Sequence, residues 1–207
     1  MNQTTLQPVQ WKDEDFDMIM VNGTPEGLPV WFDAPWLTKF NLDDFRLPTK
    51  NICRYYGAID WRLVRHLALG SMLADLYYDE HQFIKLIKAY FCAHDLHEAV
   101  VGDMVAGQKR HHPTYREQES LWEHHVHAEI GLPLKDNPDR NITRTLDLRC
   151  LAVEMVMLEH PAANIITARS GGEVTDKEKR IFRNVQSMTL EECWKYVRTT
   201  IEEVANG

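Results

Sequence analysis

The chain has 207 residues, of which 44% are hydrophobic and 26% charged, with a formal net charge of −8. This composition is typical of one globular domain that is long enough to bury a sizeable core. Asp and Glu outnumber Lys and Arg by 31 to 23, which disfavours binding to nucleic-acid polymers and to anionic membrane surfaces. No apolar run is long enough to cross a membrane and the start has no signal-peptide pattern, so we expect a cytoplasmic protein.

Residues 1–45 are rich in aromatic residues, Pro and Gly, and they show no helical periodicity. Within them, LPVWFDAPW follows the turn-forming NGTPEG, which predicts a short strand or hairpin with a loop. We therefore expect 1–45 to be an N-terminal extension packed on a main domain that comprises 46–207.

From Leu47 onward the sequence is helical, without an internal repeat. The spacing of apolar residues, with the capping and breaking residues between them, predicts helices at about 47–57, 61–79, 81–95, 114–130, 140–159, 175–188 and 189–204. The last helix opens with a Thr-x-x-Glu capping pattern at Thr189 and Glu192. The fold class we expect is all-α, a helical bundle with a short N-terminal hairpin or loop segment.

Four cysteines are spread along the chain, and no two of them form a CxxC pair. This spacing argues against a zinc ribbon or a thioredoxin-like centre. We expect them to be buried free thiols.

Three predicted helices each place ionisable side chains on an otherwise apolar stripe: His66, the pair His94 and Asp95, and Asp147. Taken singly, such a histidine is usually a satisfied core residue, and such an aspartate is usually solvated. Together they need a common explanation, because a buried imidazole or carboxylate is costly unless it is paired or binds a metal. One divalent ion such as Zn, Co, Mn or Mg would satisfy all four ligands.

Two more carboxylates follow closely in the stretch HDLHEAVVGDM. Gly102 permits a turn, so Glu98 and Asp103 could both face a metal-bound water from outside the ligand shell. We expect these two residues to be catalytic.

The H…HD…D pattern of His66, His94, Asp95 and Asp147 resembles the signature of the HD-domain metal-dependent phosphohydrolases. The longer text HDLHEAVVGDM is similar to the HDxxExxxGD segment of a subgroup that contains bacterial 5′-deoxynucleotidases and phage-type deoxynucleotide (dATP) triphosphohydrolases. NICRYYGAIDWRLVRHLALGSMLADL and LDLRCLAVE are similar to further segments of that subgroup, so the resemblance covers about 29–158 in the same order.

The resemblance implies an all-helical HD domain, with the four residues as metal ligands and with Glu98 and Asp103 assisting the attacking water. It also places Arg54 and Lys109 near the substrate phosphate. It further implies a dimer or a hexamer, and for a phage-encoded member a location in the host cytoplasm.

The expected activity is hydrolysis of nucleotide phosphoester bonds, with a deoxynucleoside triphosphate as the first substrate and a deoxynucleoside monophosphate as the alternative. A metal lowers the pKa of its water, a carboxylate accepts a proton, and Arg54 can bind phosphate through two donors. Trp61 and Arg62, just before His66, could contact the nucleotide, and packing in the core is the alternative for each. No GxSxG, HExxH or Walker pattern supports another hydrolytic design.

Two further readings stay open. The domain could be a regulatory protein that binds metal without catalysis, although Glu98 and Asp103 would then have no chemical purpose. Alternatively, a surplus of histidines could supply a second metal, as in di-iron HD oxygenases; the simpler interpretation is a solvated surface or a subunit contact. These histidines are His111, His112, His124, His125 and His127.

Overall fold

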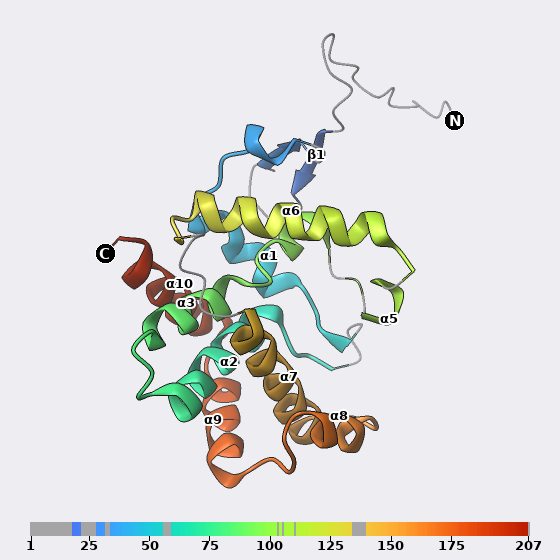
Figure 1. Ribbon diagram of the computed structural model, residues 1–207, viewed down its shortest axis with the longest axis vertical. Coiled ribbons are helices and arrows are strands. Elements are labelled where there is room, and N and C mark those ends of the chain that lie inside the picture. Colours follow the sequence, from blue (N-terminus) through green and yellow to red (C-terminus); the bar gives the residue numbers. More distant parts are fainter. Residues whose placement is uncertain are drawn as a thin grey trace.

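Figure 1 presents the structure, a computed structural model in which residues 18–21, 28–31, 34–55, 59–102, 104, 106–109, 111–133 and 140–206 are described. Helices dominate it, which confirms the all-α bundle. The expected hairpin is also present at the N-terminal side. Strands β1 (Met18–Val21) and β2 (Leu28–Trp31) are antiparallel, with Met18 opposite Trp31.

The segment after the hairpin differs from the expected short helix at 47–57. Two short 3-10 helices, η1 (Pro35–Leu37) and η2 (Leu42–Phe45), lead into α1 (Arg46–Asn51). The helix stops there because Ile52 takes an extended conformation and Cys53 forms an antiparallel bridge with Arg62. The prediction of a helix through Arg54 was therefore wrong, and Arg54 lies instead in a bend on the segment 52–55, called the strap below.

The remaining predicted helices are confirmed to within a few residues. They are α2 (Leu63–Tyr78), α3 (Ile84–Ala93), α6 (Pro113–Glu129), α7 (Arg140–Met157), α9 (Asp176–Ser187) and α10 (Leu190–Ala205). Thr189 and Glu192 form the expected capping box, and Thr175 and Glu178 form a second one that was not predicted. Three short helices were also not predicted: α4 (Glu98–Val101), α5 (Ala106–Lys109) and α8 (Ala163–Arg169).

Helix α2 lies at the centre of the bundle and packs against α3, α7, α9 and α10 (Figure 1). Its leucine stripe is fully buried at Leu69 and Leu73, next to the equally buried His66. Gly70 lets α3 approach closely, because a Cβ at that position would lie 2.0 Å from the Phe91 ring. Phe91 in turn packs against the imidazoles of His66 and His94, with ring centroids 5.6 and 4.6 Å apart.

A buried ion pair and the hydrogen bonds around it join α7, α9 and α2. Arg149 on α7 donates to both oxygens of Glu178 on α9, at 2.6 and 2.7 Å, and also to the carbonyls of Gly172 and Glu173. Tyr77 on α2 donates to the same carboxylate at 2.6 Å. This network fixes α7 against α2 and α9.

The four cysteines are free thiols, and all but the half-buried Cys53 are fully buried, as expected.

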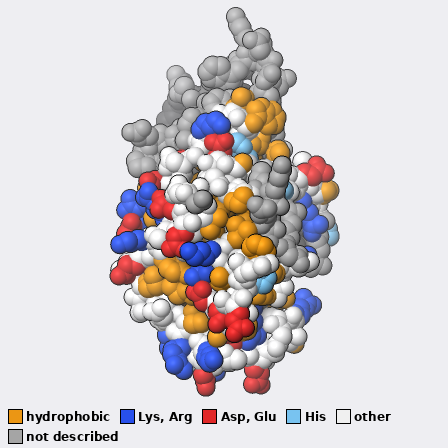
Figure 2. All heavy atoms as spheres, turned by 60° about the vertical axis from the view of Figure 1, so that its left-hand side comes forward, with side chains coloured by type: hydrophobic (Ala, Val, Ile, Leu, Met, Phe, Trp, Pro, Cys, Tyr) orange, Lys and Arg blue, Asp and Glu red, His pale blue; other side chains and the backbone are white. Residues whose placement is uncertain are grey.

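Within the described ranges, no helix is both long enough and apolar enough to span a membrane. On the face shown in Figure 2, acidic and basic side chains are intermixed among apolar groups, and the coloured residues form no continuous basic patch there.

Candidate metal centre

The structure brings together the four residues that the sequence predicts as metal ligands. His66 comes from α2, His94 and Asp95 from the turn that ends α3, and Asp147 from α7. Nε2 of His66 lies 3.2 Å from Asp147 Oδ1 and 3.9 Å from Asp95 Oδ2, and Nε2 of His94 lies 3.1 Å from that same Asp95 oxygen. Donor atoms of His66, His94 and Asp147 all lie within 4.8 Å of one another. Residues 81 positions apart in the sequence therefore form one cluster that could hold a metal ion.

The two imidazoles are oriented as metal ligands require. Nδ1 of His94 lies 2.6 Å from the Phe91 carbonyl, and Nδ1 of His66 lies 2.7 Å from Glu154 Oε1, so each Nδ1 donates its hydrogen away from the cluster. Both Nε2 atoms are buried and lie beside the oxygens of Asp147 and Asp95, but neither makes a hydrogen bond with any described residue. In the neutral imidazole that nitrogen carries the lone pair, which is the arrangement that a bound cation satisfies.

Glu154 is the functional residue that sequence reasoning missed. It is completely buried on α7, and its carboxylate accepts hydrogen bonds from His66 and, at 2.7 Å, from the hydroxyl of Tyr55. The available clue was its position seven residues after Asp147, which places both side chains on the same side of a helix. Leu151, Met155 and Leu158, which follow Asp147 at helical spacing, are only partly buried.

Arg54 reaches the cluster from the strap, residues 52–55. Its Nη1 lies 3.8 Å from Asp95 Oδ2 and its Nε lies 3.5 Å from Glu154 Oε2. The next residue, Tyr55, has a φ of 56°, a conformation that a bulky residue rarely adopts and that is found mainly at functional sites. The strap thus holds one guanidinium beside the predicted ligands.

The charges of the cluster shift the pKa values of its members. Burial alone would raise the pKa of Glu154, but His66 and Arg54 outweigh it and lower that pKa to about 2. Burial would lower the pKa of His94, yet the Asp95 carboxylate raises it to about 9. The pKa of Asp95 is lowered far below its usual range, against the effect of burial, mainly by His94. The site therefore favours positive charge at the imidazoles, whether a proton or a metal supplies it.

A second triad, His66, Cys150 and Glu154, is fully buried beside the first. Its members are already bonded to one another, since Cys150 Sγ lies 3.4 Å from His66 Nδ1 and 3.6 Å from Glu154 Oε1. It also uses the Nδ1 that orients His66 toward the first cluster. We interpret it as support for His66 and not as a second ion site.

The two expected catalytic carboxylates lie on the segment after Asp95. Glu98 is buried at the start of α4, and Asp103 lies outside the described residues.

Lys109, expected near the substrate phosphate, is ion-paired with Glu119. Burial acts to lower the pKa of Lys109, but Glu119 raises it, with smaller contributions from Glu98 and Asp95. Lys109 is therefore within electrostatic range of the cluster.

Two expected nucleotide contacts have other roles. Trp61 is only 1% exposed and its ring stacks on Phe182, with centroids 4.6 Å apart and an interplanar angle of 11°. A ring packed in this way belongs to the core and has no face free for a nucleobase, so that expectation is corrected. Arg62 donates to Asp60 at 2.8 Å and to the Asn51 carbonyl at 3.1 Å, which fixes the strap.

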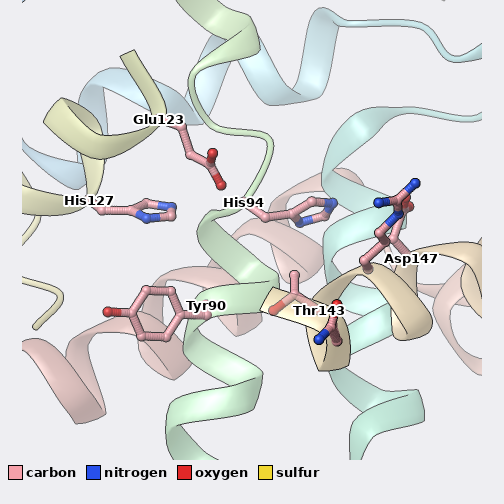
Figure 3. A pocket seen from close by; sticks show the side chains of 8 residues that line it. Tyr90, His94, Glu123, His127, Thr143 and Asp147 are labelled. Carbon is pink, nitrogen blue, oxygen red and sulfur yellow. The ribbon is translucent and has the colours of Figure 1, made fainter. Parts of the chain in front are cut away.

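A cavity of about 440 Å³ opens beside the ligands (Figure 3). His94 and Asp147 line one side of it, and Glu123 and His127 on α6 line the other. Tyr90, Asn141, Thr143 and Arg144 complete its wall. The side chain of Asp147 is 42% exposed, so this ligand faces open space and not the core. Of these residues, sequence reasoning singled out only the two ligands and His127.

The histidine surplus does not form a second cluster in the described part of the chain. None of the five extra histidines belongs to either group that could hold an ion. His111, His112 and His124 are exposed, which fits a solvated surface, whereas His125 contacts the Thr38 carbonyl at 2.7 Å and His127 is buried.

Comparison of the chain with protein-family models, with curated proteins and with solved structures finds no match in any of the three. The case for a function therefore depends on the chemistry of the site.

Proposed function

We propose that the chain is a metal-dependent phosphohydrolase of the HD type that acts on a nucleotide. The observation that carries the proposal is the pair of buried Nε2 atoms of His66 and His94, which make no hydrogen bond within the described part of the chain. They converge with two aspartates beside an open cavity. Nitrogen and carboxylate ligands without cysteine favour a catalytic ion such as Mn, Co, Zn or Mg over a structural zinc site.

The chain's own residues have distinct parts in this proposal. A divalent ion held by His66, His94, Asp95 and Asp147 would lower the pKa of a water and neutralise phosphate oxygens. Glu98 accepts the proton of the attacking water, a task suited to a buried carboxylate next to the ligand pair. Arg54 binds a phosphate oxygen with the guanidinium edge that lies near Asp95.

The volume of the cavity supports a substrate of nucleotide size, because pockets for such ligands range from about 300 to 1,000 Å³. Arg144 lies in the cavity wall one turn before Asp147, where it can contact a phosphate chain. By resemblance the first substrate is a deoxynucleoside triphosphate, and the alternative is a deoxynucleoside monophosphate.

The test is phosphate release by chelator-treated protein from deoxy- and ribonucleotides at each phosphorylation level, with Mn, Co, Zn or Mg added. We expect release from one subset of nucleotides in a metal-dependent manner, and product chromatography distinguishes phosphate from triphosphate. Release of phosphate from dAMP but not from dATP would show that the activity is that of a 5′-deoxynucleotidase and not that of a triphosphohydrolase. No release with any metal would contradict the proposal.

Glu98→Gln distinguishes an enzyme from a regulatory protein that only binds metal. We expect this variant to keep the metal and lose turnover, since the carboxylate is needed only for proton transfer. Glu117→Gln, an exposed glutamate on α6, is the matched control. Equal activity of Glu98→Gln and the control would remove Glu98 from the mechanism.

A further inference from the structure

The cavity beside the metal centre has two chemically different sides. On one side, Asp147 of α7 lies beside His94, and Arg144 of the same helix also lines the cavity. Helix α6 supplies the opposite side through His127 and, one turn earlier, Glu123 (Figure 3). A phosphate fits the first side, and the second requires a different ligand group.

His127 is held in one orientation. Its Nε2 lies 3.3 Å from the Ala93 carbonyl, and because a carbonyl only accepts, this nitrogen carries the hydrogen. The Tyr90 ring packs against the imidazole at 81°, with centroids 5.5 Å apart. The side chain is 4% exposed.

The other ring nitrogen of His127 is an acceptor. Burial lowers the pKa of this imidazole to about 4, so at neutral pH the ring carries a single hydrogen, on Nε2. Nδ1 then presents a lone pair, and it makes no hydrogen bond with the described part of the chain. Phosphate oxygens are mostly deprotonated at neutral pH and act as acceptors, whereas a sugar hydroxyl or an exocyclic amine always carries a hydrogen to donate.

We propose that His127 is a specificity-determining residue whose Nδ1 accepts a hydrogen bond from the nucleoside part of the substrate. The donor is a sugar hydroxyl or an exocyclic amine. This inference rests on the proposed function and deepens it, since it orients the nucleotide with its phosphates toward Asp147 and its nucleoside toward α6.

The test compares three substrates, at the phosphorylation level that the wild-type protein prefers. They are the deoxyadenosine nucleotide, its dideoxy analogue without the 3′-hydroxyl, and the purine analogue without the exocyclic amine. We expect the wild type to lose about tenfold in kcat/KM on one of the two analogues, which identifies the donor.

The kcat/KM of His127→Phe should be about tenfold lower than that of the wild type on the complete substrate. On the analogue that lacks the donor, the two proteins should have the same kcat/KM. His127→Gln keeps an acceptor and should recover part of the loss. His124→Gln on the exposed side of α6 is the control. A loss that His127→Phe shows equally on all three substrates, or on none, overturns the assignment.

A second readout does not need hydrolysis. Side-chain ¹⁵N spectra should show His127 Nδ1 unprotonated at pH 7 and shifted when deoxyadenosine is added. If Nδ1 responds and no nucleotide is hydrolysed, the proposed function fails while the cavity assignment stands. If nucleotides are hydrolysed and Nδ1 does not respond, the cavity assignment alone is overturned.

Discussion

Among single residues, Glu154 supports the candidate metal centre without being one of its predicted ligands. It accepts from His66 Nδ1 at 2.7 Å and from Tyr55 at 2.7 Å, and it lies 3.5 Å from Arg54. A carboxylate in this position fixes the tautomer of a metal-binding histidine and increases its basicity. The strained strap at Tyr55 is held in place by the same group.

Glu154→Gln should therefore weaken metal binding by about 10- to 100-fold, because a neutral amide supports the His66 tautomer less strongly. Calorimetric titration of the chelator-treated protein with Mn²⁺ measures the change. The control is Glu159→Gln, an exposed position on the segment that follows α7. An unchanged affinity for Mn²⁺ in Glu154→Gln would show that Glu154 does not orient the ligand.

His127 makes the folding stability depend on pH. Its pKa is lowered to about 4 in the folded protein, chiefly by burial, from about 6.5 in the unfolded chain. The unfolded chain therefore binds the extra proton first, and stability is present above about pH 6.5 and is lost as the pH falls toward 4.

Relative to His127→Phe, the wild-type protein should lose ~2 kcal/mol more unfolding free energy between pH 7 and pH 5. Urea unfolding of both proteins at the two pH values measures this difference. Parallel losses in wild type and variant would mean that folding does not lower the pKa of His127.

At the level of helices, the approach of α3 to α2 places His94 beside His66. Gly70 permits this approach, and Phe91 fills the space against both imidazoles. Gly70→Ala puts a methyl group into the Phe91 ring, and such overpacking typically costs about 1 to 3 kcal/mol.

We expect Gly70→Ala to lower both the unfolding free energy and the affinity for Mn²⁺, since the helices that carry two ligands must move apart. A second substitution, Phe91→Leu, should restore part of both by making room for the methyl group. Full Mn²⁺ affinity in Gly70→Ala would show that the centre does not depend on this contact.

The Arg149 and Glu178 pair has a structural role where α7 packs against α9. Arg149→Met leaves the fully buried Glu178 carboxylate without its charged partner, which typically costs about 3 to 5 kcal/mol. Urea unfolding should show this loss, while Arg180→Met, an exposed arginine on α9, should cause little change. Similar stability of the two variants would contradict the role of the network.

For the molecule as a whole, the parts that the sequence predicts best are those that depend on local patterns. Helical periodicity and caps are read within a few turns, which is why α2, α3, α6, α7, α9 and α10 were found. The predicted ligands carry their own signal, because His and Asp on apolar stripes stand out. Tertiary pairings have no such signal: the bond between His66 and Glu154 joins residues 88 positions apart.

The wrong predictions for Trp61 and for the conformation at Arg54 also come from tertiary contacts that have no local signal in the sequence. Trp61 was a reasonable nucleotide contact by its position before His66, but stacking on Phe182 of a distant helix decides its role. The end of α1 depends on a bridge between Cys53 and Arg62, so local helix propensity predicted the wrong conformation for Arg54. The acceptor role of His127 likewise comes from the carbonyl of Ala93, which α3 supplies.

The central claim is that one metal ion binds between α2, α3 and α7. Anomalous X-ray diffraction from crystals soaked in Mn²⁺ tests it most directly. We predict a single strong peak about 2.0 to 2.2 Å from Nε2 of His66 and of His94 and from carboxylate oxygens of Asp95 and Asp147. The peak should be missing in crystals of Asp147→Asn. A peak at other residues, or none in the wild-type protein at saturating Mn²⁺, would contradict the account.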